Sequence, residues 1–211
     1  MSVTAFSFPT NIQFGAGARR LVAAHLREAG YQRPLLVTDK ALAALPVLGE
    51  FKTHLEGLDV AVFSGVFGNP TTSQVMAGAV AFIGHRADCI IGFGGGAALD
   101  VAKLVGVAAT HTGDIIEYAW DHPEVRAIEH PLPYLVALPT TAGTGSEVGR
   151  ASVISEDDSH LKRVVFNPKL LAKCVFADPE LTLSLPPHIT AATGIDALTH
   201  NIESYLSPAY H

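Results

Sequence analysis

The chain has 211 residues, of which 48% are hydrophobic and 16% charged, and its formal net charge is −6. Such a chain can bury a sizeable core in one domain, or in one domain and part of another. The acidic balance, without any run of lysine or arginine, argues against nucleic acid and membrane surfaces as partners. Cys89 and Cys174 lie in apolar runs, which indicates buried, reduced thiols. The sequence shows no secretory leader and no bilayer-length apolar run, so we expect a cytoplasmic protein.

The first part of the chain alternates strand and helix signals. Residues 5–14 alternate apolar and polar side chains around Pro9, which predicts a β-hairpin. A helix over 18–29 is predicted to end at Gly30 in the C′ position. The next predicted elements are a strand at 34–38 that ends at Asp39, a helix to about 55, a strand at 60–64, and a helix over 75–84 capped by Thr71 or Thr72.

Further strands and helices follow in the same alternation. They are a strand at 89–91, a glycine turn, a helix over 97–109, a short helix at 114–118, an exposed loop at 121–133 and a strand at 134–138. Strands are then predicted at 148–154, 160–166 and 174–177, with a hairpin turn at 156–158. Alternation with apolar strands predicts an α/β fold whose parallel sheet is covered on both faces. A last helix over 190–206 places a domain boundary near Ser184, which divides the chain into residues 1–184 and 185–211.

The stretch from Cys89 to Lys103 is a buried strand that runs through a glycine turn into a helix. Backbone N–H groups in such a turn, together with the positive end of the helix dipole, suit a phosphate group. A tight strand-to-helix turn without a ligand is the alternative. The spacing Gly92-x-Gly94-x-x-Ala97 fits the dinucleotide fingerprint, but the turn follows several earlier elements. Asp114, at the distance of the expected acidic residue, follows a helix end, so a standard Rossmann first half is a poor fit.

Other polar groups are expected at the carboxyl ends of the parallel strands, where such sheets bind ligands. Asp39 has two candidate roles: it binds both ribose hydroxyls of an adenosine and repels a 2′-phosphate, or it caps the next helix. The loop with Thr140, Thr141, Thr144 and Ser146 suits a phosphate or ribose, with an ordinary polar loop as the alternative.

Asp196 and His200 are four residues apart in the last predicted helix, so both point to one face. Such a pair can share a divalent cation or can form a hydrogen bond across one helical turn. Two ligands do not complete a site, because a catalytic metal needs a third.

Four stretches carry a resemblance to a known family: Gly94-Gly95-Gly96-Ala97-Ala98-Leu99-Asp100-Val101-Ala102-Lys103, Pro139-Thr140-Thr141-Ala142-Gly143-Thr144-Gly145-Ser146-Glu147, Asp178-Pro179-Glu180-Leu181-Thr182, and Thr193-Gly194-Ile195-Asp196-Ala197-Leu198-Thr199-His200-Asn201-Ile202-Glu203-Ser204-Tyr205. Together they resemble the iron-containing (group III, metal-dependent) alcohol dehydrogenases. The resemblance implies a dehydroquinate synthase-like, NAD-binding α/β domain followed by the start of an all-α metal-binding domain. It covers the first half or so of a typical member.

The resemblance also implies roles for individual residues. Those expected to bind NAD are Asp39, Asn69, Gly95, Gly96, Ala97, Asp100, Thr140, Thr141, Thr144, Ser146, Lys162 and Leu181. Gly95, Gly96 and Ala97 would hold the pyrophosphate, with Ala97 in place of the usual serine. Asp196 and His200 would be the first two ligands of Fe²⁺ or Zn²⁺, which would polarise the oxygen of a small alcohol while hydride passes to the nicotinamide.

Several expectations follow for the whole protein. The family's two other metal ligands are later histidines, so we expect an incomplete metal site here and no catalytic residue within the chain. We expect association through the apolar face of the last helix and a homo-oligomer, specifically a dimer. The alternatives are an enzyme similar to glycerol dehydrogenase or dehydroquinate synthase, and a non-catalytic nucleotide-binding module.

Overall fold

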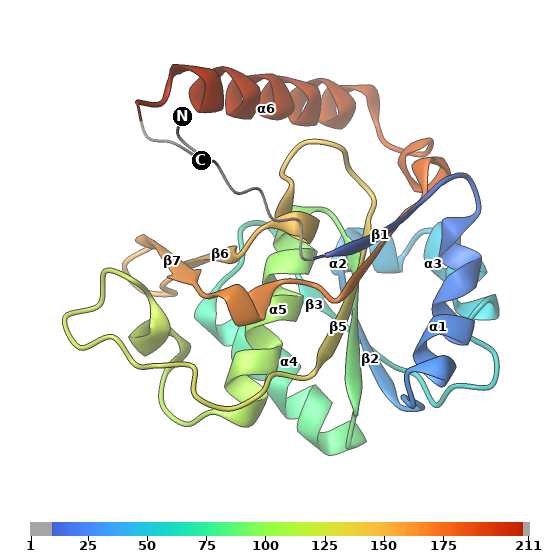
Figure 1. Ribbon diagram of the computed structural model, residues 1–211, viewed down its shortest axis with the longest axis horizontal. Coiled ribbons are helices and arrows are strands. Elements are labelled where there is room, and N and C mark those ends of the chain that lie inside the picture. Colours follow the sequence, from blue (N-terminus) through green and yellow to red (C-terminus); the bar gives the residue numbers. More distant parts are fainter. Residues whose placement is uncertain (1–9, 209–211) are drawn as a thin grey trace, which may run out of the picture.

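The computed structural model describes residues 10–208, and its centre is a parallel β-sheet. The strands are β1 (Asn11–Phe14), β2 (Pro34–Asp39), β3 (Ala61–Val66), β4 (Cys89–Gly94), β5 (Tyr134–Pro139), β6 (Ala151–Ser155), β7 (Lys162–Phe166) and β8 (Cys174–Ala177). Six of them form one sheet in the order β1-β8-β5-β4-β2-β3, and every neighbouring pair is parallel (Figure 1). The antiparallel pair β6 and β7 forms a separate small sheet. The predicted parallel α/β fold is confirmed.

Helices cover both faces of the large sheet. The α-helices are α1 (Val22–Glu28), α2 (Lys40–Ala43), α3 (Pro46–Thr53), α4 (Thr72–His85), α5 (Gly96–Thr110) and α6 (Pro187–Leu206). Short 3₁₀ turns are η1 (Ala18–Leu21), η2 (Ile115–Tyr118), η3 (Ser146–Val148), η4 (Pro168–Leu170) and η5 (Pro179–Thr182). In Figure 1, α4 and α5 lie on one side of the sheet and α1 and α3 on the other, while α6 runs above its edge.

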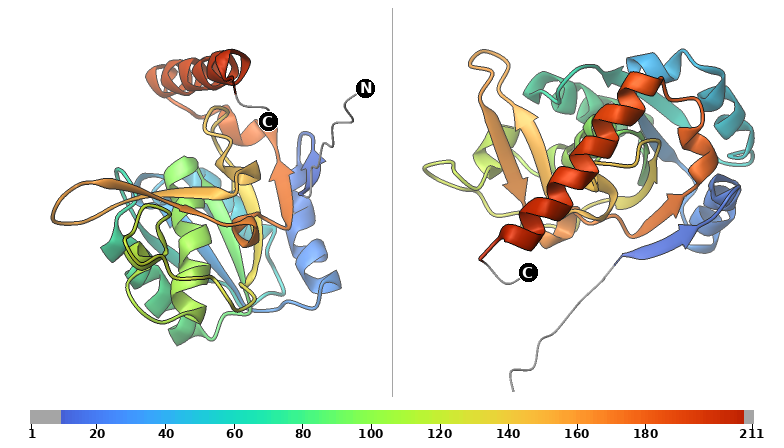
Figure 2. Two further views of the ribbon diagram at one scale, coloured as in Figure 1. Left: turned by 60° about the vertical axis from the view of Figure 1, so that its left-hand side comes forward. Right: turned by 90° about the horizontal axis from the view of Figure 1, so that it is seen from above.

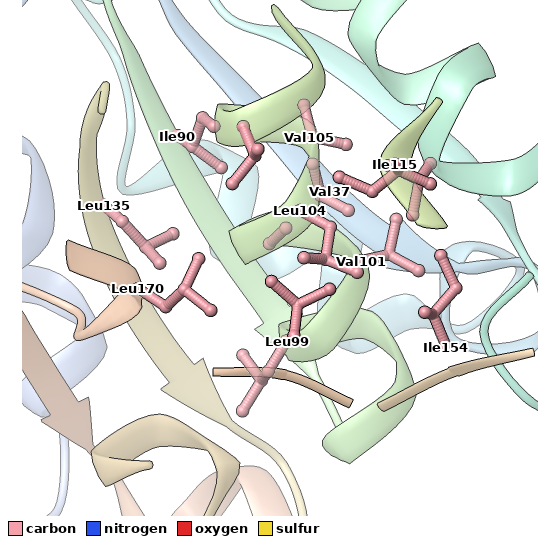
Figure 3. Close-up of a cluster of buried hydrophobic side chains, with 14 of the residues drawn as sticks. Val37, Ile90, Leu99, Val101, Leu104, Val105, Ile115, Leu135, Ile154 and Leu170 are labelled. Atoms are coloured by element: carbon pink, nitrogen blue, oxygen red, sulfur yellow. The ribbon is translucent and has the colours of Figure 1, made fainter. Parts of the chain in front are cut away.

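Two apolar clusters fill the spaces between the layers. One joins β2, β4 and β5 to α4 and α5 through residues such as Leu104 and Val105, many of which are drawn in Figure 3. The other joins the opposite face of the same strands to α1 and α3 and includes Leu26 and Phe51. All six residues of β4 are buried. This is why its sequence is an unbroken apolar run rather than an alternation.

The amino-terminal strand differs from its prediction. Residues 11–14 form β1, which pairs in parallel with β8 at one end of the sheet, with Asn11 opposite Cys174. The other half of the predicted hairpin falls mainly on residues 5–9, which lie outside the described residues. A local alternation of side chains identifies a strand, but it does not identify a partner more than 150 residues away, and the parallel pairing is a correction.

The helix predicted up to residue 55 is two helices. Leu45 is extended, with ψ of 150°, between the end of α2 and Pro46 at the start of α3. The residue before a proline disfavours helical geometry, and this breaks the segment. Gly30 has the predicted role: with φ of +88° it follows α1, and the Tyr31 N–H donates to the Leu26 carbonyl at 2.8 Å.

The cap of α4 comes from a distant segment. Thr71 occupies the N-cap position, but neither it nor Thr72 caps the helix through its own side chain. Instead, the carboxylate of Asp157 accepts from the Ser73 N–H at 2.8 Å, from the Ser73 hydroxyl at 2.7 Å and from the Thr72 hydroxyl. Asp157 lies in the turn between β6 and β7, so the predicted local cap is wrong and the hairpin is fastened to α4.

The other predicted helices and strands are present, with bounds shifted by a few residues. The 114–118 segment is η2, which Asp114 caps by accepting from the Ile116 N–H. The loop that follows is mostly exposed, although Ile128 is buried. The first hairpin strand begins at Ala151 rather than 148, because residues 146–148 form η3. Within residues 10–208, a helix with the length and apolar character needed to cross a bilayer was not found.

Candidate functional site: a nucleotide cleft at the carboxyl edge of the sheet

The chain leaves β2 and β4, which are neighbours in the sheet, toward opposite faces. After β2 it continues into α2 and α3, which pack into the cluster around Phe51, whereas after β4 it enters α5, on the other face. Ligands of open α/β sheets bind in the crevice that such a divergence creates. A cavity of about 410 Å³ lies there. It is lined by Asp39, Lys40, Ala41, Val66, Phe67, Gly68, Gly95, Ala97 and Ala98.

The glycine turn forms one wall of this cleft and has no room for side chains. Gly94 has φ of +151°, and a Cβ on it would lie 2.7 Å from the Cβ of Ala98. A Cβ on Gly96 would lie 2.8 Å from Cγ2 of Thr144. The amino end of α5 has no side-chain cap, so the N–H groups of its first turn remain available. The turn therefore offers a bare backbone surface and a helix dipole to an anion.

Asp39 has one of its two predicted roles in the structure, the helix cap. Its Oδ1 caps α2 by accepting from the Leu42 N–H at 2.7 Å. Its other oxygen, Oδ2, has no hydrogen-bond partner among residues 10–208 and lies 3.4 Å from the Cβ position of Gly94, at the wall of the cavity. One carboxylate oxygen thus remains free to accept a hydrogen bond from a ligand.

Asn69 is exposed and follows Gly68, which lines the cavity. The buried side chain of Gln74 holds this segment by donating from Nε2 to the carbonyl of Phe67 at 2.9 Å.

The loop after β5 packs directly on the glycine turn. The Thr140 N–H donates to the Gly94 carbonyl at 3.0 Å, and Thr141 lies 3.4 Å from the Cβ position of Gly95. Thr140 is buried, Thr141 is half-buried and Thr144 is exposed. The structure therefore brings together the two loops that the sequence singled out separately.

Asp100 and Ser146 lie behind the turn rather than in the cavity. The Ser146 hydroxyl donates to Oδ1 of Asp100 at 2.5 Å, and the Val153 N–H donates to Oδ2 at 2.9 Å. Lys103, which was not among the predicted site residues, donates to Ser146 Oγ at 2.9 Å and to the Ala151 carbonyl at 2.8 Å. Burial lowers the pKa of Lys103, and the nearby carboxylate of Asp100 opposes that shift. A lysine within an otherwise apolar helix was the signal that could have revealed this cluster, because a buried charge needs a partner.

Two further predicted residues lie away from the cavity wall. Lys162 is exposed at the start of β7, opposite Ser155 in the hairpin. Leu181 is only 2% exposed and belongs to the apolar cluster on the α1 and α3 side, beyond the carboxyl end of β8. Its turn is anchored by Arg19, whose guanidinium donates to the buried carboxylate of Asp178 at 2.6 Å. Burial opposes ionisation of Asp178, but the hydrogen bonds from Arg19 hold its pKa below the usual value.

Helix α6 carries the candidate metal ligands across this same edge of the sheet (Figure 2). It approaches the loop after β5 at Gly143, where a Cβ would lie 2.5 Å from the Thr193 carbonyl oxygen. His200 Nε2 and Asp196 Oδ1 are 3.8 Å apart, too far for a hydrogen bond, and both side chains are about half exposed. A second cavity, of about 510 Å³, lies between His200 and Thr144. Within residues 10–208, a set of three histidine, cysteine or carboxylate side chains that could hold a metal ion was not found.

Comparison with known proteins identifies the family. The model of the family described as iron-containing alcohol dehydrogenase matches residues 9–179. The chain belongs to this family. The sequence resemblance, drawn from the glycine turn, the threonine loop, residues 178–182 and the last helix, is therefore confirmed.

Similar curated members of the iron-containing alcohol dehydrogenase family are dehydrogenases. The chain is 40% identical to 4-hydroxybutyrate dehydrogenase from Cupriavidus necator over 203 residues, which are 96% of this chain and 53% of that protein. It is also 40% identical to 1,3-propanediol dehydrogenase from Citrobacter freundii over 198 residues, 92% of this chain and 50% of that protein. The chain thus spans about half the length of the curated relatives it matches.

Solved structures of the family have the same fold. A 1,3-propanediol oxidoreductase matches with a TM-score of 0.89 and 37% identity, over 99% of this chain and 55% of that one. Sulfoacetaldehyde reductase from Bifidobacterium kashiwanohense, solved in complex with NAD⁺, matches with a TM-score of 0.92 and 29% identity. That match covers 100% of this chain and 55% of the reductase.

Proposed function

We propose that this chain forms the NAD-binding part of a metal-dependent alcohol dehydrogenase that interconverts a small alcohol and its aldehyde or ketone. The observation that carries the proposal is the bare glycine turn at the divergence of β2 and β4, closed by the threonine loop and faced by the free oxygen of Asp39. A Cβ at Gly96 would collide with Thr144, so glycine is what allows the threonine loop to pack this closely on the turn. The residues present therefore fit a dinucleotide.

The chain's own residues divide the work of binding. The N–H groups of Gly95, Gly96 and Ala97 would hold the pyrophosphate, and Oδ2 of Asp39 would accept from the ribose hydroxyls of the adenosine. Asn69, Thr140, Thr141 and Thr144 would line the remaining cofactor, with Lys162 and Leu181 farther out. When bound, NAD supplies the hydride acceptor for alcohol oxidation. The negative charge of Asp39 disfavours the 2′-phosphate of NADP.

We also propose that Asp196 and His200 are two ligands of a divalent metal, Fe²⁺ or Zn²⁺. Their side chains lie one helical turn apart on α6, and His200 lines the cavity that Thr144 also lines. Among residues 10–208, no third histidine, cysteine or carboxylate ligand lies beside them. We place α6 in a second, all-α domain that begins near residue 185, because α6 buries none of its own residues against the sheet domain.

Calorimetric titration of the purified chain with NAD and NADP tests the cofactor proposal. We expect one NAD per chain and NADP binding weaker by about tenfold or more, because a 2′-phosphate would lie beside the carboxylate of Asp39. Asp39→Ser keeps a helix-capping oxygen but removes the negative charge. We therefore expect it to reduce the difference in affinity between NAD and NADP without unfolding α2. A folded chain that binds neither cofactor contradicts the proposal.

A further inference from the structure

Lys103 lies in the buried face of α5, where its neighbours Ala102 and Leu104 are apolar, and its side chain is 2% exposed. An ammonium group has three protons to donate and accepts none. Three acceptors surround this one: Ser146 Oγ at 2.9 Å, the Ala151 carbonyl at 2.8 Å and Asp100 Oδ1 at 3.4 Å. All three protons of the ammonium group therefore have acceptors within the protein, and none remains for a ligand in the cleft.

The side chains that Lys103 contacts also use their hydrogen-bonding groups within the protein. Ser146 accepts from Lys103 and gives its only proton to Oδ1 of Asp100, while the other carboxylate oxygen accepts from the Val153 N–H. The Ser152 hydroxyl donates to the backbone carbonyl of Asp100 at 2.9 Å. Neither Asp100 nor Ser146 lines the cavity beside Asp39. The hydroxyl of Ser146 has no donor left for a phosphate oxygen.

This cluster joins α5 to a later part of the chain. Asp100 and Lys103 belong to the helix that opens at the glycine turn. Ser146, at the end of the threonine loop, and Ala151, at the start of β6, lie 43 and 48 residues after Lys103. The threonine loop packs against the glycine turn, because Cγ2 of Thr144 lies 2.8 Å from the position that a Cβ on Gly96 would occupy. Whatever fixes Ser146 relative to α5 also fixes the width of the space between the loop and the turn.

We propose that Lys103 is a positioning residue for nucleotide binding. Through Ser146 and Asp100 it holds the threonine loop at the separation from the glycine turn that a pyrophosphate requires. Asp100 and Ser146 have the same role and do not contact the cofactor directly. This inference rests on the proposed function, since it assigns a role in binding the same nucleotide.

Lys103→Met tests the proposal, because methionine retains a long unbranched side chain but no charge or donor. Lys173→Met is the matched control, since it removes an exposed lysine near the amino end of β8, at the opposite edge of the sheet. The first readout is amide exchange without ligand at Val148 and Gly149, whose N–H groups bond within the loop at 3.1 and 3.2 Å. The second is affinity for ADP-ribose, which contains a pyrophosphate, and for adenosine, which does not.

We expect exchange at Val148 and Gly149 to accelerate about tenfold in Lys103→Met, as for a segment that loses its buried anchor. We expect affinity for ADP-ribose to fall about tenfold, while affinity for adenosine changes less than about twofold. A merely structural lysine would lower both affinities together, through the folded fraction. Equal losses for the two ligands, or unchanged loop exchange, would overturn the proposal.

Ser146→Ala keeps the test decisive should Lys103→Met fail to fold, because Lys103 then retains its bond to Ala151. The proposal expects faster loop exchange together with weaker ADP-ribose binding. Weaker binding with unchanged exchange would instead show that Ser146 touches the ligand, and would refute the positioning role. A wild-type chain that binds no ADP-ribose would refute the proposed function, and the exchange comparison would still decide whether Lys103 anchors the loop.

Discussion

The carboxyl edge of the sheet and helix α6 carry the two halves of the candidate site, and they differ in how they are held. At the sheet edge, the glycine turn, the threonine loop and Asp100 are fixed by buried contacts from several elements. Helix α6 buries no residue, and Ile195, Leu198, Ile202 and Tyr205 are exposed along it. The carboxyl edge of the sheet is therefore held by contacts among the described residues, whereas no buried residue of α6 fixes the positions of Asp196 and His200.

A pair of identical substitutions tests this difference most strongly. Leu104 in α5 is completely buried, and Leu198 in α6 is 54% exposed. We expect Leu104→Ala to lower the free energy of unfolding by about 2–5 kcal/mol, the range for a core leucine. Leu198→Ala should change it by less than about 0.5 kcal/mol, since both residues favour helices and little surface is lost. Urea unfolding of both variants measures the contrast.

The proposed difference between the sheet edge and α6 would be wrong if Leu198→Ala lowered the free energy of unfolding as much as Leu104→Ala does. A loss of stability that grows with protein concentration would mean that the apolar face of α6 is covered by another copy of the chain in solution. Sedimentation of the wild type at the same concentrations distinguishes that association from packing within one chain.

The glycine turn offers the next largest effect. A methyl group on Gly94 would lie 2.7 Å from the Cβ of Ala98, and the φ of +151° is one that alanine rarely adopts. We expect Gly94→Ala to cost about 2 kcal/mol of stability, from strain and overpacking, and to weaken NAD binding in calorimetry. Gly84→Ala is the control: its Cβ would meet no atom within 4 Å in α4, so the change should be neutral or stabilising.

Removing the carboxylate of Asp157, which joins the β6–β7 hairpin to α4, should have a smaller and pH-dependent effect on the free energy of unfolding. Hydrogen bonds from Thr72, then from Ser73, lower the pKa of Asp157 from 3.8 to about 2. Because the unfolded chain binds the proton more readily, this carboxylate stabilises the fold above pH 3.8 and loses that effect as the pH falls toward about 2. Asp157→Ala should cost about 1 kcal/mol near neutral pH, as for a lost helix cap.

Thermal unfolding between neutral pH and about pH 3 measures this prediction. The difference between Asp157→Ala and the wild type should narrow as the solution becomes acidic. Asp158→Ala, a neighbouring exposed carboxylate, should show no such trend. A difference that stays constant with pH would mean that the charge of Asp157 does not cap α4.

Local sequence patterns predicted the elements and the edge at which they converge. The apolar run of β4, the glycines after it and the strand–helix alternation are local properties, and they sufficed for the parallel sheet and the clustering of Asp39, the glycine turn and the threonine loop. Gly30 was predictable for the same reason, because a helix end is encoded within a few residues.

Apart from the break between α2 and α3, which Pro46 causes locally, the main missed features depend on partners far apart in the chain. Asp157 caps α4 from 84 residues away, and Lys103 reaches Ser146 across 43 residues. In both cases the local sequence shows a polar residue without showing its partner, so the cap was assigned to Thr71 or Thr72, and Lys103 was not included among the site residues. The edge pairing of β1 with β8 was missed for the same reason.

Removing metal should have the smallest effect of all. Structural metal sites in proteins have four protein ligands and catalytic ones at least three, whereas Asp196 and His200 have no third partner among the described residues. We therefore expect a chelator to shift the melting temperature of the chain by less than about 1 °C, because a weakly held ion adds little to the folded state. His200→Ala should leave the melting temperature equally unchanged while abolishing any residual binding of Zn²⁺. A chelator-induced drop of several degrees would mean that further ligands complete the site, and α6 would then be held as firmly as the cofactor edge.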